Sequence, residues 1–215
     1  MIVRTTAQRP EIFALVFLDR SVVDAGYAQT HQTILGDRVL NLQKEHVDLA
    51  VRIGELPDSS LIATRVGLIR NVVCASPAYF AKHGTPQKPY DLAKHDCVTF
   101  AGMMSPDAWT FKTGRSEILV PIHSRLAVNT AEAAVDAVIA GAGLTRVLSY
   151  QIEEAVKTGV LAIALKKFEP TPAPINLVYT GQRLLPLKLR AFLDFAAPRL
   201  RARLPSMAAL QTRSF

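Results

Sequence analysis

The residue types that most often carry enzyme chemistry are few in this chain and widely scattered. Its 215 residues include five histidines and two cysteines. No pair of histidines has the spacing of metal ligands on one predicted element. Neither Cys74 nor Cys97 lies in a nucleophile motif, and no Gly-x-Ser-x-Gly elbow occurs. We therefore expect no catalytic residue, no metal ion and no cofactor.

The same residues have plain structural interpretations. Cys74 and Cys97 each lie in an apolar, strand-like run, which predicts reduced thiols packed as small hydrophobic groups. His83 and His95 each lie near the end of a predicted short helix, where a histidine commonly caps carbonyl groups. Gly141-Ala142-Gly143 follows a predicted helix instead of a strand. It therefore indicates a helix cap and a tight turn, not a dinucleotide-binding loop.

One feature favours binding of an anion. Asn129 follows a predicted strand and is placed to cap a helix over 130–140, with Glu132 three residues later as in a capping box. This helix is rich in alanine, so it can pack closely on a sheet. The amide groups and dipole at its start suit a carboxylate. Such helix starts at the carboxyl ends of strands are where open α/β sheets bind ligands.

Strands and helices alternate along the chain as they do in βαβ units, which predicts an α/β fold with mainly parallel sheets. Ser76 is placed to cap a helix that begins at Pro77 and ends before Gly84. Ser149 is placed to cap another, and Pro186 opens the last long helix. The predicted strands are 47–53, 61–63, 69–75, 97–100, 109–112, 118–122, 125–128, 144–148, 161–165 and 175–179.

Charge and hydropathy bear on the class of partner. The formal net charge is +7, and basic residues crowd the C-terminal end, where most of them decorate one amphipathic helix. No aromatic residues interleave with them as in single-strand binders, so a solvated basic face is the expected interpretation. No apolar run reaches the roughly 18 residues of a membrane span, and the start lacks a signal-peptide pattern. We expect a cytoplasmic protein.

Several segments, taken in order, resemble the effector-binding domain of LysR-type transcriptional regulators. The resemblance runs from about residue 37 to 204, and each piece alone is weakly specific. The matching segments are DRVLNL at 37–42, VDLAVRIG at 47–54, LPDSSL at 56–61, CASPAY at 74–79, HGTP at 83–86, Asp91-Leu92, His95-Asp96-Cys97, Trp109 with Phe111, Asn129 with the helix into Gly141-Ala142-Gly143-Leu144, and LLPLKLRAF at 184–192.

The resemblance implies a fold of two Rossmann-like α/β lobes joined by two crossover strands, like a type 2 periplasmic binding protein. The effector-binding domain would span 1–204, with lobe I at about 1–72 and 168–204, and lobe II at about 73–167. Residues 205–215 would form a flexible tail. Members of this family are usually homodimers, and they contact DNA through a helix-turn-helix domain that nothing in this chain resembles.

The first 35 residues admit two interpretations. In one, 2–6 form the family's first strand and 11–24 its first helix. In the other, Pro10-Glu11-Ile12 and Leu18-Asp19-Arg20 belong to the family's second strand. The second interpretation would place that strand unusually early and would alter the surface that the family uses for dimerisation.

The resemblance also implies a ligand-binding wall. Carried over by position, it comprises Thr5 or Thr6 at the first strand end, Arg52, Ile53 and Gly54 after a later strand, Phe100 in the other lobe, and Asn129 and Thr130 at a helix start. Each has a structural alternative. Arg52 can instead pair with Asp48 or Asp37, and Phe100 can be a core residue.

Together these features predict a ligand-sensing regulatory domain that binds a small anionic or aromatic-acid effector between its lobes without covalent chemistry. A solute-binding protein of the transport class would share the fold, but it would need an export signal. A small α/β enzyme would need a nucleophile–base pair or a cofactor loop. A protein that binds DNA through the basic C-terminal helix would show salt-dependent DNA binding on its own.

Overall fold

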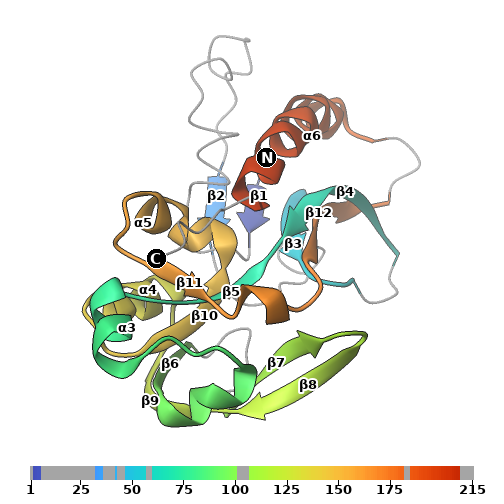
Figure 1. Ribbon diagram of the computed structural model, residues 1–215. Helices are drawn as coiled ribbons and strands as arrows, with labels where there is room; N and C mark the ends of the chain where they lie inside the picture. The colour runs from blue at the N-terminus through green and yellow to red at the C-terminus, as the bar shows by residue number, and fades with distance from the viewer. Residues whose placement is uncertain are drawn as a thin grey trace. The chain divides into compact units, whose positions relative to one another are not determined.

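The computed structural model describes residues 2–5, 32–35, 42, 47–56, 60–100, 107–181 and 185–208. The chain divides into two compact units (Figure 1). The first comprises Met1–Leu68 and Ala173–Ser206, and the second is built on the middle of the chain, Ile69–Pro172. Up to Ser206, the chain therefore passes between the units twice.

The first unit is built on a five-stranded sheet in the order β2-β1-β3-β12-β4. Strand β1 (Ile2–Thr5) is parallel to both β2 (Gln32–Leu35) and β3 (Leu49–Ile53). Strand β12 (Ala173–Thr180) enters from the second unit and runs antiparallel to β3. Strand β4 (Leu61–Ile69) closes the described sheet at the far edge.

Helix α6 (Leu187–Ala208) completes the first unit and packs closely on β4. A Cβ added to Gly67 would lie 2.6 Å from Cδ1 of Leu204, so the helix lies close to the strand at this glycine and a larger residue would require Leu204 to shift. The buried residues of α6 follow the predicted helical spacing: Leu189, Phe192, Ala196, Ala197, Leu200 and Leu204. The helix continues to Ala208, past the predicted domain end at Leu204. No helix in the described ranges, α6 included, is both long and apolar enough to cross a membrane.

The path from the first unit into the second differs from the sequence prediction. Strands were predicted at 61–63 and 69–75, but β4 is continuous over Leu61–Ile69 and β5 follows at Asn71–Ala75. Only Arg70 separates them. The prediction at 61–63 covers only the start of β4 for a physical reason. Much of β4 is exposed, so its sequence lacks the apolar run that marks a buried strand.

The second unit is built on a five-stranded sheet in the order β11-β5-β10-β6-β9. Strands β6 (Asp96–Phe100), β9 (His123–Val128) and β10 (Leu144–Leu148) are parallel, and β5 runs antiparallel to β10. The remaining elements are α3 (Pro77–His83), the 3-10 helices η1 (Pro89–Lys94), η2 (Ser149–Ile152) and η3 (Lys166–Phe168), α4 (Ala131–Ile139), α5 (Glu153–Lys157) and β11 (Ala162–Ala164).

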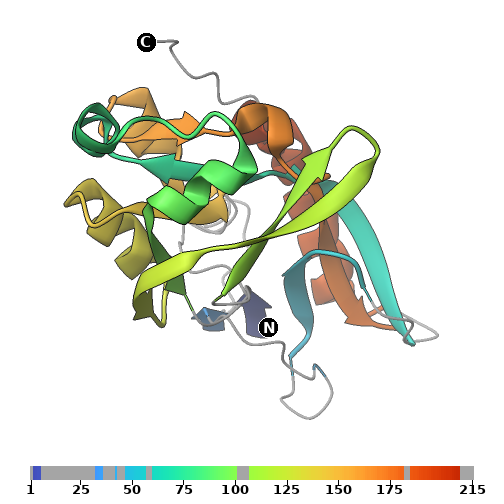
Figure 2. The ribbon, with the colours of Figure 1, turned by 60° about the horizontal axis from the view of Figure 1, so that its bottom comes forward.

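Two cores lie on opposite faces of this sheet. On one face α4 packs its buried alanines with Val98, Val147 and Ile152. On the other face Trp109 and Phe111 pack with Leu92, Cys97 and Leu144. The two aromatic residues come from a separate hairpin of β7 (Ala108–Thr113) and β8 (Ser116–Pro121), coloured yellow-green in Figure 2. The predicted strands at 109–112 and 118–122 are confirmed.

The two sheets share one strand order. The first unit reads β2-β1-β3-β12-β4 and the second β9-β6-β10-β5-β11. In each, three parallel strands are followed by the strand through which the chain enters the unit from the other one, β12 or β5, and then by one further strand. In both, the strand next to the chain crossing is antiparallel to its neighbour. The prediction of two Rossmann-like α/β lobes joined by two crossover strands is confirmed. The expectation of mainly parallel sheets is wrong, because the crossover strands make both sheets mixed.

Candidate functional site

The carboxyl edge of the second unit's sheet gathers the ends of three parallel strands. Strands β6, β10 and β9 end there at Phe100, Leu148 and Val128. Helix α4 begins at Ala131, shortly after β9 ends. This edge therefore holds both a helix start and the side chains that follow the strands.

Thr130 caps the start of α4. Its backbone is extended (φ −135°, ψ 149°), and its Oγ1 accepts the backbone N–H of Ala133 at 3.2 Å. The predicted cap at Asn129, with Glu132 as its capping-box partner, is therefore wrong by one residue. The chain stays extended through Thr130, so the helical turn and its first unsatisfied N–H groups lie one residue further on.

The start of α4 is electrostatically suited to an anion. Its aligned peptide groups place a partial positive charge at Thr130 and Ala131, which stabilises a nearby negative charge by about 0.3–1 kcal/mol, or about 2 kcal/mol where partly buried. Ala131 and Ala134 are buried against the sheet, and their small side chains let the helix lie close to it. The helix end is thus fixed in place by the core and by its own cap.

Phe100 lies beside this helix start. It pairs with Val128 across β6 and β9, so it is adjacent to the segment that carries Asn129 and Thr130. Its ring is 5% exposed and shares a core with Ala131, while Asn129 is exposed. Phe100 therefore supports the first turn of α4, as the structural alternative expected. Its contact with a ligand remains a prediction.

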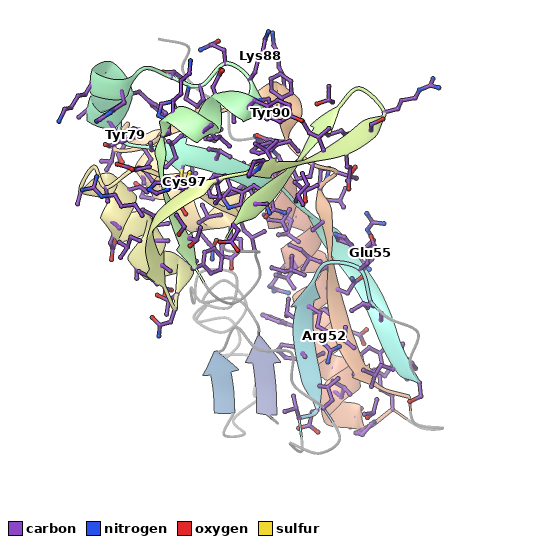
Figure 3. All side chains as sticks on the ribbon, turned by 90° about the horizontal axis from the view of Figure 1, so that it is seen from below. Arg52, Glu55, Tyr79, Lys88, Tyr90 and Cys97 are labelled. Atoms are coloured by element: carbon purple, nitrogen blue, oxygen red, sulfur yellow. The ribbon has the colours of Figure 1, made fainter. Side chains whose placement is uncertain are left out.

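The first unit gathers the other predicted residues on a corresponding edge. Thr5 ends β1 and pairs with Val51 of β3, so it neighbours the residues that close β3. Arg52 and Ile53 are half-buried. Gly54 has φ 107°, a conformation that favours glycine, and its N–H donates to the carbonyl of Pro174 at 2.9 Å. Figure 3 shows Arg52 on β3 and Glu55 just beyond the strand end.

The structure therefore brings the predicted residues together in two groups. Thr5 lies with Arg52, Ile53 and Gly54 in the first unit. Phe100 lies with Asn129 and Thr130 in the second. Thr6 lies outside the described residues. The role of all these residues in binding stays a prediction.

Sequence reasoning missed Ser149. It follows β10 directly, as Gly54 follows β3, and β10 and β3 hold the same place in the shared strand order. Ser149 is 0% exposed, and its Oγ has no hydrogen-bond partner in the described part of the chain. A buried hydroxyl without a partner costs about 1–3 kcal/mol, so it points to a missing partner such as a ligand or water.

Ser149 was predicted to cap a helix, and this is wrong because its neighbours have taken that role. The side-chain Oε1 of Gln151 accepts the N–H of Leu148 at 2.9 Å. The N–H of Ser149 itself donates to the carbonyl of Arg70 at 2.9 Å. The backbone on each side of the hydroxyl is thereby fixed. The shared strand order, which becomes visible only after folding, was the signal that identifies this position.

The cysteines and His95 show no sign of a reactive centre. Burial raises the pKa of Cys74 to about 12, and burial with the nearby Asp96 carboxylate raises the pKa of Cys97 to about 12. His95 is the C-cap residue of η1, where its backbone N–H donates to the carbonyl of Leu92 at 3.0 Å, and its Nδ1 lies 3.3 Å from the hydroxyl of Tyr79. Figure 3 labels Tyr79 and Cys97 in this region. In the described ranges, no three His, Cys, Asp or Glu side chains are grouped to hold a metal.

The comparisons with known proteins agree on one family. Residues 30–201 match the family described as LysR substrate binding domain. The chain is 31% identical over 170 residues to an HTH-type transcriptional regulator of Xanthomonas campestris pv. campestris, covering 77% of this chain and 49% of the relative. It is 31% identical over 157 residues to the HTH-type transcriptional activator AaeR of Escherichia coli, covering 72% and 50%. The chain spans about half the length of the curated relatives it matches.

Solved structures agree. The CrgA regulatory domain of Neisseria meningitidis, a LysR-type transcriptional regulator, aligns with a TM-score of 0.76 at 27% identity, covering 93% of this chain and 98% of that one. A full-length AphB variant aligns with a TM-score of 0.80 at 20% identity over 92% of this chain and 67% of that chain, which supports the fold alone. With residues 30–201 matched to its family model, the chain belongs to the LysR substrate-binding domain family.

Proposed function

We propose that this chain senses a small anionic or aromatic-acid effector for a LysR-type transcriptional regulator. The effector binds between the two lobes without covalent chemistry and draws them together. Lobe closure then changes how the full-length protein, through a helix-turn-helix domain, contacts DNA. The regulator acts in the cytoplasm as a homodimer.

The observation that carries this proposal is the start of α4. Thr130 caps the helix at the edge where the parallel strands β9, β6 and β10 end, next to Phe100 of β6, and the buried hydroxyl of Ser149 follows β10 at the same edge. A helix dipole recognises a carboxylate, a hydroxyl donates to it, and an aromatic edge suits an aromatic acid. Thr5 and the Arg52–Gly54 segment of the first unit are proposed to contact the effector as well, and Arg52 carries a positive charge.

A substitution that keeps the fold but repels an anion tests this site. Thr130→Asp preserves a good N-cap and places a carboxylate where the effector's carboxylate would lie. Thr113→Asp is the matched control, because Thr113 is an exposed residue at the end of β7 in the same unit. The protein is melted with a panel of benzoate, salicylate, succinate and 2-oxoglutarate.

An acid that binds should raise the melting temperature of the parent and of Thr113→Asp by several degrees. A free acid concentration a hundredfold above the dissociation constant adds about 2.7 kcal/mol to the free energy of unfolding. Thr130→Asp should melt at or above the parent without ligand and gain nothing from the acid. If Thr130→Asp responds to the acid as the parent does, α4 is not the anion site. Chemical turnover of a bound acid would contradict a purely sensory role.

A further inference from the structure

The two chain crossings each have a charged residue beside them. The chain enters the second unit between Leu68 and Ile69 and leaves it between Pro172 and Ala173. Arg70 lies just inside the entry, in the break between β4 and β5. Glu169 lies just before the exit, directly after η3. These two residues are 99 positions apart in sequence.

Arg70 and Glu169 form a two-bonded ion pair. The Nε of Arg70 donates to Oε2 of Glu169 at 2.6 Å, and its Nη2 donates to Oε1 at 2.6 Å. Their side chains are only 11% and 13% exposed. Two ion pairs elsewhere in the second unit involve more exposed partners: Arg125 with Asp96 at 67% and 32%, and Lys157 with Glu153 at 57% and 15%. The pair at the crossings is better protected from water than either.

Arg70 also holds the sheet edge that carries the candidate site. Its carbonyl accepts the N–H of Ser149 at 2.9 Å, which extends the pairing of β5 with β10 by one residue. Arg70 therefore makes three connections. Its backbone is part of the entry crossing, its guanidinium binds Glu169 near the exit crossing, and its carbonyl binds Ser149 at the end of β10. All three connections lie within the second unit.

We propose that the Arg70–Glu169 pair is a clamp that fixes both crossings to the second unit and so limits how far the two units turn against each other. The geometry favours this because a planar, two-bonded pair restrains direction as well as distance. Removing one partner breaks a largely buried, two-bonded pair, so the crossing segments must rearrange. This inference rests on the proposed function, in which turning of the units carries the effector signal.

The test measures the distance between the two units in the absence of any effector. A negative result is therefore distinct from a failure to find an effector. Exposed residues Asp136 on α4 and Asp194 on α6 are replaced by cysteine and spin-labelled, and the distance distribution is measured by double electron–electron resonance. The native thiols are buried with raised pKa values and should stay unlabelled. Glu169→Gln and Arg70→Gln remove the pair, and Arg70→Glu with Glu169→Arg restores it in reverse.

We expect each single variant to broaden the distribution by roughly twofold, because the two units then sample more orientations. The reversed double variant should return towards the parent width. Glu153→Gln, which breaks the exposed Lys157 pair in the same unit, is the control and should leave the width unchanged. A merely structural pair would lower the melting temperature of the singles without broadening. That result, in variants that remain folded by circular dichroism, would overturn the clamp.

Discussion

Gly143 lies directly against the backbone carbonyl of Asp96. A Cβ added to Gly143 would be 2.3 Å from that oxygen, well inside van der Waals contact. Gly143 also has φ 150°, and it immediately precedes β10, whose first residue pairs with Cys97 of β6. The turn predicted at Gly141-Ala142-Gly143 is thus confirmed, and it brings β10 into place beside β6.

Gly143→Ala should therefore destabilise the second unit strongly. The added methyl must displace the start of β6 or of β10, and we expect a loss of about 3 kcal/mol or more, as for other overpacked buried sites. Gly141→Ala is the matched control. Gly141 has φ 85° but nothing within 4 Å of an added Cβ, so only backbone strain of about 1 kcal/mol applies. Urea unfolding measures both, and equal losses would contradict the close contact.

The cap of α4 distinguishes two adjacent residues. Thr130→Ala should lower the free energy of unfolding by about 1 kcal/mol, because it removes the acceptor of the Ala133 N–H. Asn129→Ala should change it by a few tenths at most, since Asn129 is exposed and precedes the cap. Chemical denaturation compares the two variants. A larger loss for Asn129→Ala would restore the cap that the sequence alone predicts.

Local signals in the sequence placed most element ends correctly. Ser76 accepts the N–H of Tyr79 at 3.3 Å, Pro77 opens α3, and Gly84 follows its end, all as predicted. The buried positions of α6 also follow from helical spacing. These features depend on residues close together in the chain, so they can be predicted from the sequence without knowing the fold.

The misses depend on contacts between distant residues. Asn129 and Thr130 are both good caps by type, and the choice depends on where the pairing of β9 with β6 ends. The full length of β4 depends on its place in the sheet beside β12, because much of the strand is exposed and lacks an apolar pattern. The position of Ser149 at the candidate site depends on a strand order that only the folded sheets reveal. No periodicity or cap signal encodes such relationships.

Ser149→Ala should stabilise the unliganded protein while weakening effector binding. It removes a buried hydroxyl that has no partner in the described residues, so the free energy of unfolding should rise by about 1 kcal/mol or stay level. If that hydroxyl contacts the effector, the thermal shift produced by a binding acid should shrink. Ser76→Ala is the control: it should cost about 1 kcal/mol through the lost cap of α3 and leave binding intact. Destabilisation by Ser149→Ala would show that the hydroxyl already has a partner.

His95 predicts a loss of stability at acid pH. Burial lowers the pKa of His95 below its ordinary 6.5, and the nearby His83 lowers it further, against the opposing carboxylates of Asp91 and Asp96. Above pH 6.5 the ring is neutral in both the folded and the unfolded chain. Below pH 6.5 the His95 ring takes up a proton in the unfolded chain but not yet in the folded one. The free energy of unfolding therefore decreases as the pH is lowered, until the pH reaches the pKa of His95 in the folded chain.

Urea unfolding at about pH 7.5 and about pH 5.5 should show this fall in the parent and a smaller one in His95→Gln, whose amide can still reach the Tyr79 hydroxyl. His83→Gln is the control on the exposed side of Tyr79, where His83 stacks at 4.5 Å between ring centroids. It should keep most of the parent's pH dependence. An undiminished fall in His95→Gln would assign the acid sensitivity to carboxylates instead.

The most direct test of the proposed sensor is an amide-resolved NMR titration of the parent protein with the acid of the panel that raises its melting temperature most. The account predicts that the largest shifts fall on Thr130 to Ala133, Phe100 and Ser149, and that Thr130→Asp abolishes them. Shifts centred on the basic face of α6, or no shift with any of the four acids, would contradict an anionic effector bound at the start of α4.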